Sequence, residues 1–95
     1  MKHLEIIIHS DPGHAWAEVD KTLLKELGIR SQISGYSYQK DDKVFLEEDC
    51  DLPKFIQAWE AAGNTYSFTE LHKENTPIRN YPKYKPLVLA AVERF

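Results

Sequence analysis

The sequence has few of the features that mark a secreted, membrane-inserted or nucleic-acid-binding chain. It contains a single cysteine, Cys50, which excludes an internal disulfide and favours a reducing compartment. No apolar run approaches the roughly 18 residues that a membrane span needs, and the first residues lack the pattern of a secretory signal. The net charge of −3 gives no general affinity for nucleic acid or for an anionic membrane. These absences predict a cytoplasmic protein with no membrane association.

The composition is that of an ordinary globular chain. The 95 residues, 42% of them hydrophobic and 28% charged, are enough for one domain with one core. The composition changes after residue 72, where three prolines and several basic residues appear within residues 73–86. We therefore expect an α+β domain over residues 1–72. An irregular basic arm and a short helix at Leu87–Phe95 should pack on the same domain.

The apolar spacing predicts four strands and two helices. Strands are expected over residues 3–9, 33–39, 44–47 and 65–72, with helices from the turn at 10–13 to Leu27 and over 52–62. Asp51 is the natural N-cap of the second helix, and Gly63 supplies its left-handed end. The order β-α-β-β-α-β is typical of the ferredoxin-like split βαβ fold. This fold has a four-stranded antiparallel sheet with both helices on one face, and the strands at 3–9 and 44–47 should lie side by side at its centre.

The other face of that sheet would carry several aromatic side chains. Tyr36, Tyr38 and Phe45 form a patch too apolar to remain in water. We expect a second copy, in a homodimer, or the segment Leu87–Phe95 to cover it. The aromatic rings could stack RNA bases, but Glu5 and Glu47 lie among them and would repel phosphate. Direct nucleic-acid binding is therefore not expected.

The loop before Trp16 is a candidate anion site. A glycine-containing turn at the start of a helix can bind an anion through its backbone N–H groups. Gly13, His14 and Trp16 would form the site in that case. The alternative is a capped helix start with Trp16 in the core. The four histidines show no ligand spacing, so neither a metal site nor a cofactor is expected.

The segment from Lys40 to Asp51 is strongly acidic. It holds six acidic and two basic residues, a local charge of −4, and Glu47, Glu48 and Asp49 have no evident structural purpose. Residues 73–86 carry a local charge of +3. These three residues, Glu47, Glu48 and Asp49, form what we call the acidic corner. It could be a solvated surface or a patch that binds a partner. The predicted partner-binding residues are Glu47, Glu48, Asp49, Tyr36, Tyr38, Arg79 and Tyr81.

Four short motifs carry a resemblance to a protein family. At PGHAW, SGYSY, LEEDCD and IRNY, from about Ile6 to Tyr84, the chain resembles small uncharacterised proteins of tailed phages and prophages. Those proteins have PGHGW-like, SxYSY-like and LEED-like motifs in the same order. Ala15 stands where that family has glycine, which weakens the case for a backbone site there. The resemblance implies a phage origin, and hence the cytoplasm of a host cell, but no activity.

These features favour a non-catalytic binding protein over an enzyme. The interpretation is a small phage or prophage protein that acts on a host or phage protein. It would inhibit a host defence or nucleic-acid enzyme through its acidic surface. The alternative is a small enzyme or a nucleotide- or anion-binding protein that uses the Asp11–His14 loop, Arg79 and the acidic corner.

Overall fold

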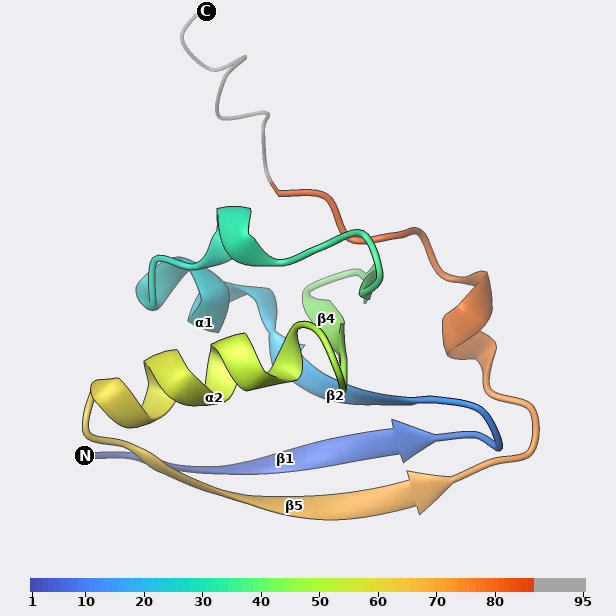
Figure 1. The fold of residues 1–95 in the computed structure, drawn as a ribbon, viewed down its shortest axis with the longest axis horizontal. Helices are drawn as coiled ribbons and strands as arrows, with labels where there is room; N and C mark the ends of the chain where they lie inside the picture. The colour runs from blue at the N-terminus through green and yellow to red at the C-terminus, as the bar shows by residue number, and fades with distance from the viewer. Residues whose placement is uncertain (87–95) are drawn as a thin grey trace, which may run out of the picture.

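The chain folds into one five-stranded mixed sheet with two helices (Figure 1). The computed structural model describes residues 1–86. The predicted helix at 87–95 lies outside the described residues. The elements are β1 (His3–Ser10), β2 (Ala15–Asp20), α1 (Lys21–Glu26), the 3-10 turn η1 (Arg30–Gln32), β3 (Tyr38–Lys40), β4 (Lys43–Glu47), α2 (Leu52–Ala61), β5 (Thr65–His72) and the 3-10 turn η2 (Pro77–Asn80).

The sheet confirms the α+β class but not the ferredoxin-like arrangement. Its strand order is β3-β4-β2-β1-β5, so β2 separates the two strands expected to be central neighbours. β1 pairs antiparallel with β2 and parallel with β5. The prediction of four antiparallel strands was therefore wrong, because the chain contains one more strand and joins β5 to β1 in parallel.

The additional strand is residues 15–20, which the sequence predicted to be helical. Ala17 and Val19 point to the buried side of the sheet and Trp16 to the other, as alternation in a strand requires. The same apolar residues also fit a helical spacing with Leu23 and Leu24, so the pattern was ambiguous. The strand is favoured because β2 pairs on both sides, with β1 and with β4. The helix begins only at Lys21.

The second predicted helix is confirmed. Phe55 and Trp59 are buried on its inner side, and the Trp59 indole N–H donates to the Thr65 carbonyl at 2.7 Å. Gly63 has a φ of +85°, the left-handed end that the sequence predicted. Asp51 precedes the helix, but its side chain makes no capping hydrogen bond. Asp51 thus occupies the predicted N-cap position, but its carboxylate accepts hydrogen bonds from another segment and not from the backbone N–H groups of the first turn.

That segment is the loop from Ser34 to Ser37, which was predicted to be part of a strand. Only Tyr38–Lys40 pairs with β4, and the hairpin between these two strands is confirmed. The serine hydroxyls at 34 and 37 donate to Asp51 Oδ2 at 2.7 and 2.5 Å. Ser37 is fully buried, so its hydroxyl needs a hydrogen-bond partner, and Asp51 supplies one. These bonds tie the loop to Asp51, and the loop does not continue the strand.

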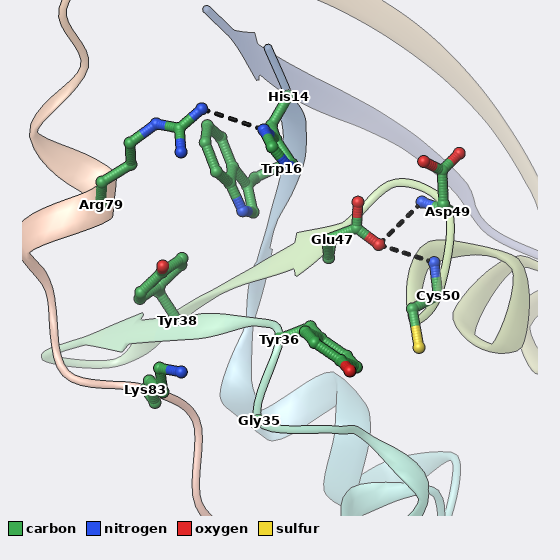
Figure 2. A pocket seen from close by; sticks show the side chains of 10 residues that line it. All are labelled: His14, Trp16, Gly35, Tyr36, Tyr38, Glu47, Asp49, Cys50, Arg79 and Lys83. Carbon is green, nitrogen blue, oxygen red and sulfur yellow. Dashed lines mark hydrogen bonds between the residues drawn. The ribbon is translucent and has the colours of Figure 1, made fainter.

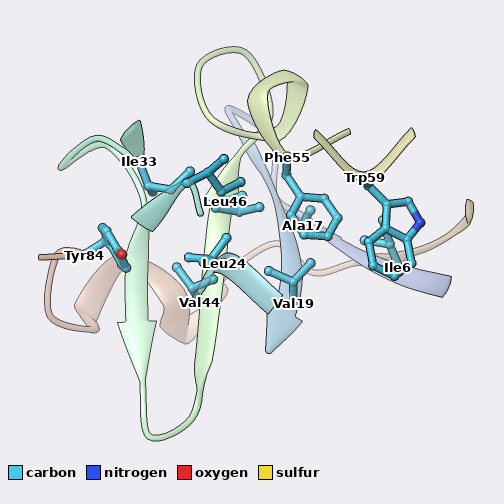
Figure 3. Packing of buried hydrophobic residues seen from close by; sticks show 11 residues of the cluster. Ile6, Ala17, Val19, Leu24, Ile33, Val44, Leu46, Phe55, Trp59 and Tyr84 are labelled. Atoms are coloured by element: carbon cyan, nitrogen blue, oxygen red, sulfur yellow. The ribbon is translucent and has the colours of Figure 1, made fainter. Parts of the chain in front are cut away.

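Both helices pack against one side of the sheet, which we call the helix face (Figures 1 and 3). Alternate residues of β1, β2 and β4 meet Leu24 of α1 and the rings of α2 there. The buried side chains of this cluster are Ile6, Ala17, Val19, Leu24, Ile29, Ile33, Val44, Leu46, Phe55, Trp59 and Tyr84. Neither helix within residues 1–86 has the length and hydrophobicity that crossing a bilayer requires.

The opposite side of the sheet, which we call the arm face, is covered in part by residues 77–84. Ile78 of η2 packs on Trp16 and Phe45, with Tyr38 and Tyr81 at the margin of this cluster. Some of the predicted cover is thus supplied from within the chain. It comes from η2, whereas the sequence favoured a second copy or residues 87–95.

The same arm also lines the β3 edge of the sheet. The Gln39 N–H donates to the Pro82 carbonyl at 2.9 Å, and the Tyr84 N–H donates to the Ser37 carbonyl at 2.8 Å. The Tyr84 hydroxyl donates a hydrogen bond to the Arg30 carbonyl at 3.0 Å. These bonds fix the position of the arm along its length.

Candidate functional site

A pocket opens on the arm face where β2, β3, the end of β4 and the arm meet (Figure 2). Its volume is about 310 Å³. We call it the central pocket, and its lining residues are His14, Trp16, Gly35, Tyr36, Tyr38, Glu47, Asp49, Cys50, Arg79 and Lys83. Most of the residues predicted from sequence as site residues are therefore neighbours, although they come from four separate segments.

Three predicted site residues lie elsewhere. Gly13 and Glu48 line a second hollow of about 400 Å³ beside the β1–β2 turn. Tyr81 packs against Phe45, with ring centroids 5.3 Å apart, and Lys40 Nζ lies 5.0 Å from the Tyr81 ring centroid. Tyr81 therefore contributes to the packing of the arm and does not line the central pocket.

One wall of the central pocket is a stack of three planar side chains. His14 lies parallel to Trp16, with ring centroids 5.9 Å apart, and the Arg79 guanidinium carbon lies 5.3 Å from the Trp16 centroid. Arg79 Nη2 donates to His14 Nδ1 at 2.9 Å. Because a guanidinium can only donate, the neutral imidazole carries its proton on Nε2. That N–H is the group that His14 can offer to a ligand.

Asp11 fixes this wall from behind. Its carboxylate accepts Arg79 Nε at 2.6 Å and Arg79 Nη2 at 3.0 Å, a two-pronged pairing. The hydrogen bond from Arg79, together with backbone N–H groups, outweighs burial and holds the pKa of the Asp11 carboxyl well below its usual range. The charge of Arg79 is consequently neutralised within the chain.

The same carboxylate removes the basis for the predicted anion site. The N–H groups of Gly13 and His14 donate to Asp11 Oδ1 at 3.0 and 2.8 Å. No helix begins here either, since β2 follows the turn. The backbone donors that were expected to bind an external anion are thus satisfied by the chain's own carboxylate.

The acidic corner forms the opposite wall. Glu47 Oε1 accepts the N–H groups of Asp49 and Cys50 at 3.0 and 2.8 Å (Figure 2). Glu47 therefore has a structural role that the sequence did not reveal, because it closes the turn after β4. Glu48 and Asp49 are exposed, and no ion pair among residues 1–86 involves either of them.

Asp51 supports the rim that carries Tyr36. It is completely buried and accepts hydrogen bonds from Ser34, Ser37 and Lys54. Burial opposes its ionisation, but these bonds together outweigh that effect and lower the pKa of the carboxyl. Tyr36, between the two serines, is 71% exposed. The sequence did not predict the hydrogen bonds between Asp51 and the two serines. The one feature that could have suggested them is the pair of serines on either side of Gly35-Tyr36.

A chain of polar groups that resembles a catalytic triad runs from the second hollow, where Ser10 and His72 lie, to Glu74. The Ser10 hydroxyl lies 2.9 Å from His72 Nδ1, and His72 Nε2 lies 3.1 Å from Glu74 Oε2. However, the hydroxyl proton of Ser10 is donated to Glu70 Oε2 at 2.7 Å. The Ser10 proton therefore points to Glu70 and not to His72, so in this arrangement His72 does not act as a base toward the Ser10 hydroxyl.

Histidines do not assemble into a metal site in the described part of the chain. His9 bonds to Glu18 at 2.8 Å and His14 to Arg79, so these two do not meet as ligands. Within residues 1–86 no three His, Cys, Asp or Glu side chains converge closely enough to hold a metal ion.

Comparison with known proteins returned no matching family model, no matching curated protein and no matching solved structure. The resemblance to phage proteins therefore stays a prediction. A function can therefore be inferred only from the geometry and charge of the central pocket and its surroundings.

Proposed function

We propose that the protein is a small, non-catalytic binding protein of a phage or prophage. It recognises a basic surface of a host or phage protein through the central pocket and the adjoining acidic corner. The observation that carries this proposal is the convergence of Tyr36, Glu47 and Asp49 on one concave surface. Buried carboxylates, Asp11 and Asp51, hold the loops on either side of that surface.

The charge of the surface supports a basic partner. Arg79 is neutralised by Asp11, whereas Glu48 and Asp49 have no partner in any ion pair among residues 1–86. The outward charge of the corner is therefore negative. Exposed carboxylates at the margin of an interface guide a partner into position and speed its association. An exposed aromatic residue such as Tyr36 is typical of the residues that dominate binding energy.

Inhibition of a nucleic-acid enzyme is the specific form of this proposal. The turn after β4 holds Glu47, Glu48 and Asp49 in succession, and Glu47 is fixed by its two backbone hydrogen bonds. Glu47 fixes the turn, and the exposed carboxylates of Glu48 and Asp49 on that turn would take the place of phosphates in the basic groove of a host enzyme. Binding would then compete with the nucleic acid and weaken as salt is raised.

The test compares two double variants with the same change in net charge. Glu48→Gln/Asp49→Asn removes the exposed charges of the corner, and Glu26→Gln/Glu60→Gln removes two exposed charges at the C-terminal ends of α1 and α2. Partners are captured from host lysate, with and without phage infection, and then measured as purified proteins. We expect the corner variant to bind more weakly and with a smaller salt dependence. Equal binding by both variants and the parent would refute the proposal.

A small ligand is the second candidate, and the size of the pocket favours it. A volume of about 310 Å³ lies at the lower end of the range for small-molecule sites. His14 Nε2–H, Tyr36 and the acidic corner would contact such a ligand, since the Asp11–His14 backbone is already occupied. Native mass spectrometry of the purified protein distinguishes the candidates. A bound small molecule that is lost in His14→Ala would favour this second function.

A further inference from the structure

The two edge strands of the sheet differ in whether another segment pairs with their outer side. The edge at β3 is joined by residues 82–84 of the arm, which contain Pro82 and bond to Gln39 and Ser37. The edge at β5 pairs only with β1 within the described part of the chain. An open edge presents a row of free backbone N–H and C=O groups to any strand that can align with it.

The hydrogen bonds to β1 identify which groups of β5 are free. The N–H groups of Thr65 and Lys73 donate to the carbonyls of Lys2 and Ser10 at 2.8 and 2.9 Å. In a parallel pair every second residue bonds to the same neighbour, so the odd-numbered residues of β5 face β1. The N–H and C=O groups of the even-numbered residues therefore point outward, and these residues are Tyr66, Phe68, Glu70 and His72.

This edge lacks the usual protection against pairing. Natural edge strands carry lysine, proline or a bulge, or they are very short. β5 has eight residues with the sequence TYSFTELH, which contains neither lysine nor proline. Its only acidic side chain, Glu70, accepts a hydrogen bond from Ser10. Phe68 and Leu71 are 49% and 45% exposed, so the strand also presents apolar surface.

We propose that β5 pairs antiparallel with β5 of a second copy of this chain, with Phe68 on the two-fold axis. Free backbone groups on both strands are satisfied only when even-numbered residues face even-numbered residues. Centring the pair on Phe68 places the two rings together, Tyr66 opposite Glu70 and Thr65 opposite Leu71. No like charges face each other in this register. A centre at Thr69 would instead place the Glu70 carboxylate against Phe68.

The resulting dimer has one continuous sheet with all helices on the same side. This surface differs from the sheet face on which the sequence predicted self-association. The central pocket lies near the other edge, around Tyr38 and Arg79, and stays open in both copies. The dimer would therefore present two pockets to a partner, and its existence does not depend on the proposed function.

The test uses opposite charges at the axis. Phe68→Glu and Phe68→Lys are measured separately and as an equimolar mixture by analytical ultracentrifugation of the full chain. We expect the parent to dimerise reversibly and each variant alone to associate at least about tenfold more weakly. The equimolar mixture should recover dimers. Tyr36→Lys, the same kind of change at an exposed ring in the central pocket, should leave the dimer intact. A monomeric parent at millimolar concentration would overturn the proposal. Variants that dimerise as tightly as the parent would also overturn it, as would a mixture that does not recover dimers.

A second measurement requires no variant at position 68. The amides of Phe68 and Glu70 should exchange with solvent slowly in concentrated parent protein and faster on dilution, because no strand within residues 1–86 pairs with them and a second copy would. The amides of Ser67 and Thr69, which face β1, should show the same protection at both concentrations. Concentration-independent exchange at Phe68 and Glu70 would contradict the edge pairing even if the protein were dimeric.

Discussion

The helix face and the arm face are formed by the same strands but hold different kinds of side chain. On the helix face, α1 and α2 cover one continuous apolar cluster. On the arm face, a small cluster of Trp16, Phe45 and Ile78 is surrounded by paired charges and opens into the central pocket. The larger part of the buried apolar surface is therefore on the helix face, and we expect most of the stability to come from that side of the sheet.

The largest expected effect is on the helix face. Phe55→Ala or Trp59→Ala should reduce the free energy of unfolding by about 3–5 kcal/mol, because each ring is buried and leaves a cavity. Such a loss approaches the whole stability of a small domain. Phe68→Ala, at the half-exposed edge, is the matched control in dilute protein. Denaturant unfolding measures all three, and near-native stability of the first two would contradict the assignment of the core.

The next effect concerns the carboxylate that ties the pocket rim to the helix side. Asp51→Ala should cost roughly 2–4 kcal/mol, because the donors of Ser34 and Ser37 lose a charged acceptor in a buried place. Asp49→Ala, at an exposed carboxylate two residues away, should cost much less. Unfolding of both variants at neutral pH is the measurement. Equal stabilities would mean that Asp51 does not hold the loop.

Asp51 also gives the helix side a pH dependence with a definite sign. The folded state lowers the pKa of Asp51, so its contribution to stability is complete above the ordinary carboxyl pKa. That contribution is lost as the pH falls through the lowered, folded-state pKa. Stability of the parent should therefore fall more steeply in acid than that of Asp51→Ala. Parallel acid profiles for the two proteins would argue against this origin.

A smaller effect is expected from the cluster on the arm face. Ile78→Ala should cost about 2 kcal/mol, near the low end for a buried isoleucine, because the arm can settle onto the space left. Its main consequence should be local, with faster trypsin cleavage after Lys83 and unchanged helix content. Leu71→Ala, which removes a half-exposed side chain, is the control. Cooperative unfolding of the whole domain by Ile78→Ala would show that the two faces are not separable.

Much of the helix side could be predicted from the sequence. The stripe of Phe55 and Trp59, the glycine end at Gly63 and the hairpin before β4 followed from spacing and turn chemistry. Each of these signals is local, so no knowledge of distant residues was needed. Residues 15–20 were mispredicted because their apolar positions fit both periods. Only pairing with β1 and β4, which is a long-range event, decided between them.

The site was harder to predict, because its contacts join distant residues. Arg79 and Asp11 are separated by 68 positions, and no local pattern links them. The residue types that suggested binding were nevertheless brought together, including His14, Tyr36 and Glu47. Their separate duties were not visible. Asp11 and Glu47 both fold back on backbone N–H groups, which a sequence does not distinguish from carboxylates that face solvent.

The Asp11–Arg79 pair predicts a further, smaller pH effect confined to the arm face. The folded-state pKa of Asp11 is lowered, mainly by Arg79, so the pairing is complete above the ordinary carboxyl pKa and is lost as the pH falls through the lowered, folded-state pKa. We expect the Ile78 and Tyr81 amides in the arm to lose protection from hydrogen exchange as the pH is lowered. Asp11→Asn should loosen the arm already at neutral pH and remove most of the dependence. Unchanged exchange in that variant would contradict the role of the pair.

The smallest effect on stability should come from the acidic corner. Glu48→Gln/Asp49→Asn should change the free energy of unfolding by about 0.5 kcal/mol or less, because both side chains are exposed and make no ion pair within residues 1–86. The sign should be neutral or slightly stabilising, since adjacent like charges repel each other.

Glu47 differs from these two residues, because its carboxylate holds the turn after β4. Adding Glu47→Gln provides the internal check. The amide oxygen of the substituted side chain can still accept the N–H groups of residues 49 and 50, but without the charge that strengthens those bonds. The triple variant should therefore be less stable than the double variant by about 1 kcal/mol. If the double variant is as destabilised as the triple, Glu48 and Asp49 have structural duties of their own, and the acidic corner is not a surface reserved for a partner.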